Sequence, residues 1–341
     1  EMPEQGPFAG PEFAWCWWRA FGTPGDQLHI LVAEADNGVP AGILPLYRKK
    51  GRSRLMPLGA PLHADYWNFS VCETGRQEAA KAISAALAEL PGWRCLCMPN
   101  VPERSDSTAC LLAAMKAHGL RVLVEPAPPC MATSFDQHLS VESLLKKSSL
   151  PRIVRQSFRR MEEHGLRPDF SIDPPSDPLV DEIIAFDLER GMGSAKCTGF
   201  FTSAAAGRFV KLLAASQAAR DIRIATLRFD GRLASYLFCF DTPRELQMYF
   251  TATDRSLTLY RPGVVLTWLV LRHSMDRGKT SYNFLLGDEE YKRRWRAAPL
   301  RQQSIRIYGR SPIAAAMMSG RICLRWVKRR AKDLVSSRST A

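Results

Sequence analysis

The sequence has little of what membrane-spanning or secreted proteins need. None of its apolar runs reaches the length of about 18 uncharged residues that a membrane-spanning helix requires. Residues 1–8 have neither a basic start nor an apolar stretch, so no secretory signal peptide is expected. The protein is therefore expected in the cytoplasm or, through the basic tail described below, peripherally at the inner face of the membrane.

Cysteine and histidine show none of the spacings that hold a metal. The nine cysteines and six histidines are scattered, and only Cys95 and Cys97 stand close together. A Cys-x-Cys pair in a strand-like stretch directs both side chains to one face, whereas a zinc site needs two such pairs or nearby histidines. No metal is predicted, and the cysteines are interpreted as reduced, small apolar side chains.

Three catalytic signatures are missing as well. The sequence has no Gly-x-Ser-x-Gly elbow, no Walker loop and no dinucleotide fingerprint, so no acyl-enzyme or nucleotide-hydrolase mechanism is indicated. What is present is a chain of 341 residues, 46% hydrophobic, which suits one large or two medium domains. Its net charge of +13 favours an anionic partner, such as a phosphate-bearing cofactor, a nucleic acid or an acidic lipid surface.

Strand and helix signals alternate in the first third of the chain. Two β-rich stretches, 28–33 and 41–47, flank the hairpin turn Asp36-Asn37-Gly38. Helices are expected over 77–90 and 107–118, and strands over 93–98 and 120–125. The proline-rich residues 126–129 are expected to end this pattern in a turn, which places a domain boundary after residue 127.

The second part has a different order. Helices are expected over 151–164, 179–190 and 203–216, followed by strands 222–229, 233–240 and 246–252, helix 264–276, strand 281–286, a short helix 288–296 and strand 303–308. An antiparallel meander that leads into a βαβ unit indicates a mixed α/β sheet. We predict domains at 1–127 and 128–310, and a basic amphipathic tail at 311–341.

Two segments of the second part have residues suited to chemistry. At the junction before helix 264–276, Pro262 fits a first helical turn and Gly263 lets an anion approach the free N–H groups, with Arg261 nearby. After strand 281–286, Tyr291 can donate a proton and a carboxylate can accept one, at the strand end where ligands gather in α/β sheets. An ordinary strand-to-helix turn and a helix with dipole-matched charges remain the alternatives. In the first part, His63 and Asp65 lie in a loop that contacts a substrate or is merely surface.

Four segments carry a family resemblance: 232–236, 249–254, 260–266 and 282–295. Together they resemble the GNAT-like acyltransferases of the CelD type, from cellulose and exopolysaccharide biosynthesis. These are similar to the Fem peptidyltransferases, which carry two GNAT-like domains. The family commonly has Tyr-Ser-Pro-Gly where this chain has Tyr260-Arg261-Pro262-Gly263, and Asp where it has Asn283.

The resemblance implies two GNAT-like domains in tandem and an N-acetyltransferase that uses acetyl-CoA or another acyl-CoA as co-substrate. It implies that the donor is held by Tyr260, Arg261, Gly263, Val264 and Val265. Asp288 or Glu289 would be the base and Tyr291 the acid. The acceptor it implies is an amine or hydroxyl of an amino sugar or polysaccharide precursor. From their places in the sequence, we expect His63, Asp65, Asn283, Lys292 and Trp295 to bind it.

Two other functions fit the same residues. A Fem-like transferase would take its acyl group from aminoacyl-tRNA, which the basic charge also allows. A degenerate, non-catalytic module would act in exopolysaccharide biosynthesis, with its tail on an anionic membrane, because basic residues alternate there with Ile322, Leu324 and Trp326.

Overall fold

A computed structural model describes residues 6–60, 62–135, 140–192 and 200–338. The chain divides into two compact units: unit 1 comprises residues 1–5, 23–127 and 303–341, and unit 2 comprises residues 6–22 and 128–302. It passes from unit 2 to unit 1 after residue 22, and crosses again within β6 (Arg121–Ser134) and β12 (Ala298–Tyr308). The boundaries predicted at 127/128 and 310/311 stay a prediction, because compactness does not show which segments fold alone.

Unit 1 is built on a mixed sheet. Its strands are β1 (Gln27–Glu34), β2 (Pro40–Arg48), β3 (Arg54–Pro57) and β5 (Cys95–Pro102), in the order β1-β2-β3-β5-β12-β6, with β4 (Ser70–Val71) paired to β2. β1 and β2 form the hairpin predicted around Asn37-Gly38, with Leu31 opposite Leu44. β3 and β5 are parallel.

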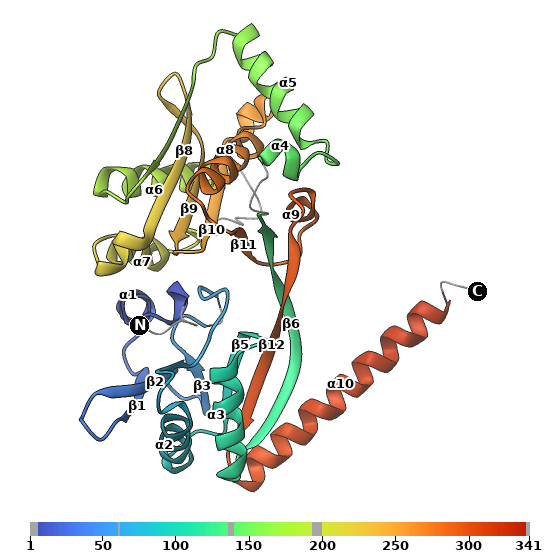
Figure 1. The fold of residues 1–341 in the computed structure, drawn as a ribbon. Helices are drawn as coiled ribbons and strands as arrows, with labels where there is room; N and C mark the ends of the chain where they lie inside the picture. The colour runs from blue at the N-terminus through green and yellow to red at the C-terminus, as the bar shows by residue number, and fades with distance from the viewer. Residues whose placement is uncertain (1–5, 61, 136–139, 193–199, 339–341) are drawn as a thin grey trace. The chain divides into compact units, whose positions relative to one another are not determined.

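The helices of unit 1 cover opposite faces of this sheet. Leu96 and Met98 of β5 belong to the core beneath α2 (Arg76–Glu89) and α3 (Asp106–Ala117). Cys95 and Cys97, which point the other way because side chains alternate along a strand, pack with Ala314 of α10 (Pro312–Arg338). The predicted helical tail is thus confirmed, and its first turns cover a sheet face (Figure 1).

Unit 2 contains the meander and the βαβ unit that the sequence predicts. Its strands are β7 (Pro168–Asp173), β8 (Ile222–Phe229), β9 (Arg232–Asp241), β10 (Glu245–Thr253) and β11 (Ser281–Leu286), in the order β6-β11-β10-β9-β8-β7. β7 to β10 pair antiparallel, and β11 pairs parallel to β10 after the crossover helix α8 (Pro262–Asp276). The mixed α/β class is therefore confirmed.

Alternating residues of β9 divide the core of unit 2 into two layers. Leu237 and Cys239 belong to an aliphatic core with α8 and α5 (Leu150–Glu163). Phe238 and Phe240 face an aromatic cluster with Tyr249 of β10, covered by the aromatic side chains of α1 (Pro11–Phe21) and α7 (Ala204–Ala214). Figure 1 shows α5 and α8 apart from α6 (Asp177–Met192) and α7. The remaining elements are η1 (Pro7–Ala9), α4 (Val141–Leu144), η2 (Gln217–Asp221), η3 (Arg255–Tyr260) and α9 (Glu290–Arg294).

The turn predicted at residues 126–129 is wrong. β6 is one strand from Arg121 to Ser134 and passes through Pro126, Pro128 and Pro129 without turning. Proline fixes an extended φ and removes only the N–H, so it is compatible with a strand wherever that N–H is not needed by a neighbour. The prolines mark the crossing between the units, not a reversal of the chain.

Candidate functional site

A cavity of about 420 Å³ lies in unit 2, beyond the point where β10 and β11 stop pairing. The two parallel strands are paired only over Glu245–Gln247 and Ser281–Asn283. Farther along, β10 shifts its register against β9 between Met248 and Phe250. Such a bulge re-aims side chains and is frequent next to ligand sites. The apolar side chains that line the cavity are Leu150, Leu237, Met248, Pro262, Val264 and Trp295.

The polar wall of this cavity is strongly cationic. It holds four arginines, Arg190, Arg255, Arg261 and Arg294, against a single carboxylate, Asp254. Arg190 pairs with Asp187 at 2.9 Å, and Asp254 pairs with Arg232 at 2.7 Å. Among the residues that the structure describes, the other three arginines have no carboxylate within 4.0 Å. A cavity with an excess of guanidinium groups attracts a polyanion.

The N-terminus of α8 forms part of the same wall. Arg261 has left-handed backbone geometry, with φ at 51°, and its carbonyl accepts hydrogen bonds from the N–H groups of Val264 and Val265 at 3.0 and 3.1 Å. Pro262 has no N–H, so Gly263 supplies the remaining amide of this first turn. The anion site predicted here thus rests on one backbone amide, the helix dipole and Arg261, since two of the expected donors are already bonded.

Three of the five residues predicted to hold the donor line the cavity: Arg261, Gly263 and Val264. Tyr260 instead accepts or donates a 2.7 Å hydrogen bond with Nδ1 of His164 and packs edge-on against Phe229. Val265 is fully buried in the aliphatic core. The donor-binding role of all five residues stays a prediction. Only Arg261, Gly263 and Val264 are placed to touch a ligand in this cavity.

The predicted acid–base residues are separated by the structure. Tyr291 lines the cavity with 45% of its surface exposed, and partial desolvation of its hydroxyl, reinforced by the charge of Glu289, raises its pKa to about 12. Asp288 is held by Arg293 at 2.9 and 2.6 Å, and this hydrogen bonding lowers the pKa of the Asp288 carboxyl. Glu289 pairs with Lys292 at 2.9 Å. Neither carboxylate is among the residues that line the cavity.

The side chains of Lys292 and Asn283 hydrogen-bond to the backbone at the end of β11. The buried ammonium of Lys292 donates to the carbonyls of Leu286 and Gly287 at 2.6 and 3.1 Å, so its protons are used within the loop. Oδ1 of Asn283 accepts from the N–H of Leu285 at 2.9 Å, and Leu285 has a φ of 57°, which is unusual for a leucine. Their predicted role in acceptor binding stays a prediction; the geometry shows them holding a strained turn. Trp295, the last residue of this group, lines the cavity.

His63 and Asp65 lie in unit 1, in the loop between β3 and β4. Burial lowers the pKa of His63 to about 4, so its ring is neutral at neutral pH. Sequence reasoning did not single out Arg255, Arg294, Thr251 or Thr253 as cavity residues. Arg255 and Arg294 lie close in sequence to the predicted site residues, but only the fold shows that both line the same cavity.

No group of three or more His, Cys, Asp or Glu side chains is placed to hold a metal ion within residues 6–60, 62–135, 140–192 and 200–338. No helix in those ranges is both long and apolar enough to cross a membrane.

Comparison with known proteins places this cavity in a recognisable domain. Residues 146–293 match the acetyltransferase (GNAT) domain family. No curated protein matches the sequence.

Solved structures resemble the chain over nearly its whole length. FemX superposes with a TM-score of 0.63 at 10% identity, over 93% of this chain and 95% of FemX. L-PGS from Bacillus licheniformis gives a TM-score of 0.54 at 14% identity, over 96% of this chain and 99% of L-PGS. The C-terminal domain of a putative lysylphosphatidylglycerol synthetase of Agrobacterium fabrum gives 0.52 at 12% identity, over 94% and 92%. At these identities the similarity concerns the fold. Residues 146–293 thus match a GNAT acetyltransferase domain, within a chain of mixed α/β fold that resembles the fold of FemX over most of its length.

Proposed function

We propose that unit 2 binds an acyl-CoA in the cationic cavity and transfers its acyl group to an amine or a hydroxyl. The observation that carries this proposal is the placement of Arg255, Arg261 and Arg294 on one cavity wall with Gly263; among the described residues none of the three has a carboxylate within 4.0 Å. Coenzyme A has three phosphate groups and an apolar arm, and the cavity combines a cationic wall with an apolar one. The GNAT match of residues 146–293 supports the same donor.

In this proposal Arg261 and the N–H of Gly263 bind the diphosphate, and the apolar wall with Met248 and Val264 receives the arm that carries the acyl group. Transfer is direct: the acceptor attacks the thioester carbonyl and the C–S bond breaks. Tyr291 donates its proton to the leaving sulfur, which its raised pKa permits because the hydroxyl stays protonated at neutral pH. Asp288 or Glu289 remains the proposed base, reached through water or after its ion pair opens.

Titration calorimetry with acetyl-CoA tests the donor. We expect binding by the unmodified protein and at least tenfold weaker binding by Arg261→Ala. Arg272→Ala is the matched control, because Arg272 lies on the same helix, is exposed and does not line the cavity. Absence of binding by the folded wild-type protein would sink the acyl-CoA proposal.

The resemblance to CelD-type enzymes favours an amino sugar or a polysaccharide precursor as acceptor, and an acetyl group as the cargo. We therefore propose glucosamine-type amines as the first acceptors to assay, with release of free CoA as the readout. A protein that binds acetyl-CoA and transfers to no acceptor would favour the degenerate, non-catalytic alternative.

An aminoacyl-tRNA donor is the second candidate. Its support is the whole-chain similarity to FemX together with the net charge of +13. Binding of tRNA should weaken steeply with salt, because each neutralised phosphate releases counterions. Salt-sensitive tRNA binding without binding of acetyl-CoA would favour this donor over the first.

The surface of α10 supports the proposal that the tail contacts an anionic membrane. Ile313, Met317 and Leu324 form an exposed apolar stripe at helical spacing on α10, in a segment rich in Lys and Arg. Such a helix lies on anionic bilayers. We expect co-sedimentation with vesicles that contain phosphatidylglycerol and loss of it in Met317→Glu/Leu324→Glu. Equal sedimentation of both proteins would contradict a membrane role for the tail.

A further inference from the structure

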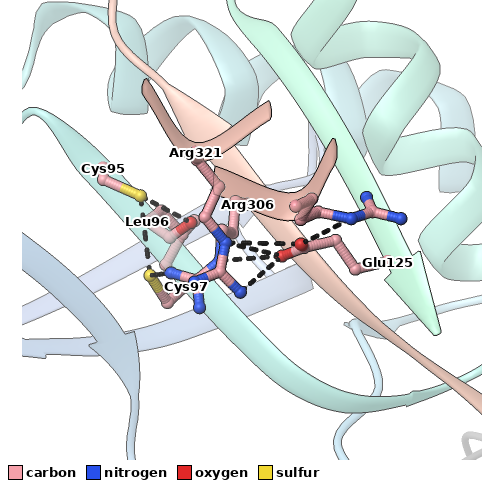
Figure 2. Close-up of polar contacts among 7 residues, drawn as sticks. Cys95, Leu96, Cys97, Glu125, Arg306 and Arg321 are labelled. Carbon is pink, nitrogen blue, oxygen red and sulfur yellow. Dashed lines mark hydrogen bonds and ion pairs between the residues drawn. The ribbon is translucent and has the colours of Figure 1, made fainter. Parts of the chain in front are cut away.

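A row of three polar side chains crosses the central strands of unit 1. Cys97 of β5, Arg306 of β12 and Glu125 of β6 lie on neighbouring strands and point toward one another (Figure 2). The guanidinium of Arg306 donates to Sγ of Cys97 at 2.9 Å and to Oε2 of Glu125 at 3.1 Å. The side chain of Arg306 is mostly buried, so both contacts act in a poorly hydrated environment.

A second thiol adjoins the first. Cys95 and Cys97 are on the same face of β5, their sulfur atoms are 3.5 Å apart, and both residues are buried beneath Ala314 and Met318 of α10. Residues two apart in a strand have Cα atoms about 6.4–6.8 Å from each other. That separation is within the range that a disulfide spans, at its upper end, so a bond needs only a local adjustment of β5.

The surroundings distinguish the two sulfur atoms. The hydrogen bond between the two sulfur atoms, together with the charge of Arg306, lowers the pKa of Cys97, whereas the same hydrogen bond and burial raise the pKa of Cys95. A thiolate is the nucleophilic form of cysteine, and redox-active cysteines stand beside cations, next to a second thiol, where solvent reaches the sulfur. Of the two residues, Cys97 is the more exposed, at 6% against 3%. Cys97 is therefore suited to attack, and Cys95 to resolve the product.

We propose that Cys95 and Cys97 form a redox-active dithiol, which a small peroxide oxidises to an intrachain disulfide. The Cys97 thiolate attacks one peroxide oxygen, the O–O bond breaks, and Cys97 becomes a sulfenic acid. The Cys95 sulfur then attacks the Cys97 sulfur, forms the S–S bond and releases water. In sum, two thiols and one hydrogen peroxide give one disulfide and two waters, so the peroxide takes up both electrons. Arg306 positions the reactive sulfur.

Trypsin makes this testable, because cleavage after Arg94 and Arg104 yields one peptide, residues 95–104, that contains both cysteines and no other. The full chain is treated with hydrogen peroxide, quenched, alkylated in denaturant and digested without reductant. We expect peptide 95–104 to be unalkylated and lighter by two hydrogen atoms than the reduced peptide. Residues 233–244 supply the internal control. Cys239 is buried like the pair, but burial and the charge of Asp241 raise its pKa, so it should remain a thiol and be alkylated.

Two variants assign the roles. In Cys95→Ser the sulfenic acid at Cys97 should persist long enough for dimedone to trap it. In Arg306→Met, disulfide formation should slow by roughly tenfold, because loss of the guanidinium raises the pKa of the Cys97 thiol by about one unit. Circular dichroism checks that both variants fold. The proposal is overturned if wild-type peptide 95–104 stays fully alkylated, if Cys97 over-oxidises without forming a disulfide, or if either cysteine joins another peptide instead.

Discussion

Gly263 lies where the first turn of α8 meets the end of β10. A Cβ at this position would be 2.7 Å from Oγ1 of Thr253, and that hydroxyl is already engaged with Oγ of Ser235 at 2.9 Å. A glycine is therefore required here by proximity, not by an unusual φ. The close approach is what brings the amide of residue 263 to the cavity wall.

We predict that Gly263→Ala destabilises the protein by about 1–3 kcal/mol, the usual cost of overpacking, and weakens donor binding. The same substitution in a Thr253→Ala background should cost much less, because the obstructing hydroxyl is gone. Urea unfolding of the four proteins of this cycle measures the coupling. Equal costs in both backgrounds would show that Thr253 is not the obstacle.

Tyr291 is the one predicted acid–base residue on the cavity wall. Its folded pKa of about 12 lies above the ordinary value, so the hydroxyl keeps its proton throughout the neutral range. With an acceptor that the wild-type protein uses, Tyr291→Phe should lower kcat by about 100-fold, the lower range of general acid catalysis, and leave the Kd for acetyl-CoA nearly unchanged. Release of CoA thiol, followed with a chromogenic disulfide, gives the rate. Full activity in the phenylalanine variant would remove Tyr291 from the mechanism.

Residue types at the site were readable from the sequence, but their partners were not. Pro262 and Gly263 predict a helix N-terminus that can bind an anion, and the structure places Gly263 on the cavity wall. Asp288 and Lys292 stand in an equally suggestive segment, yet Asp288 is paired with Arg293 and Lys292 binds backbone carbonyls. Spacing along the chain does not distinguish a side chain that faces a ligand from one that closes its own loop.

At the scale of elements, α10 is joined to its sheet through one buried carboxylate. Glu125 accepts hydrogen bonds from Arg306 and Arg321 and pairs with Arg325 at 3.3 Å. Burial alone would raise the pKa of Glu125, but the hydrogen bonds from these arginines lower it. Arg321 and Arg325 are four residues apart, so one face of the helix reaches the same group.

Glu125→Gln should therefore destabilise unit 1 by about 3 kcal/mol, because it leaves the buried Arg306 without its carboxylate. Amide hydrogen exchange in the first turns of α10 should accelerate as well. Glu89→Gln is the control: Glu89 is exposed and 3.8 Å from Arg310, so its loss should cost well under 1 kcal/mol. Similar unfolding midpoints for the two variants would contradict the anchoring role of Glu125.

The sequence predicts elements well where local signals agree and poorly where tertiary packing decides. Asp230-Gly231 fixes a hairpin, and the structure has β8 and β9 there. β6 was missed as one strand because its prolines carry the signature of a turn, and only pairing with β11 and β12 shows that they are extended. α1 was not predicted, although Phe13, Cys16, Trp17 and Ala20 recur at helical spacing and are buried. The structure shows this face packed within unit 2, with Phe13 against Phe209.

At the scale of the whole molecule, the burial of histidine rings makes the stability of the fold depend on pH. Burial lowers the pKa of His63 to about 4, and it also lowers the pKa of His29 and His273. An unfolded histidine has a pKa of about 6.5. Between these values the unfolded chain binds more protons than the folded one, so stability falls as the pH falls.

The contribution of His63 should be fully present above about pH 6.5 and lost as the pH falls to about 4, a change of up to about 3 kcal/mol. His63→Gln removes the titrating group and should flatten the pH dependence of the unfolding free energy of unit 1 over that window. Urea unfolding midpoints at intervals from about pH 7.5 to about pH 4 measure this pH dependence. His118→Gln is the control, because the ring of His118 is only half-buried. If the two variants keep the wild-type slope, the ring of His63 is solvated in the folded protein, and the acid sensitivity of the molecule comes from its other groups.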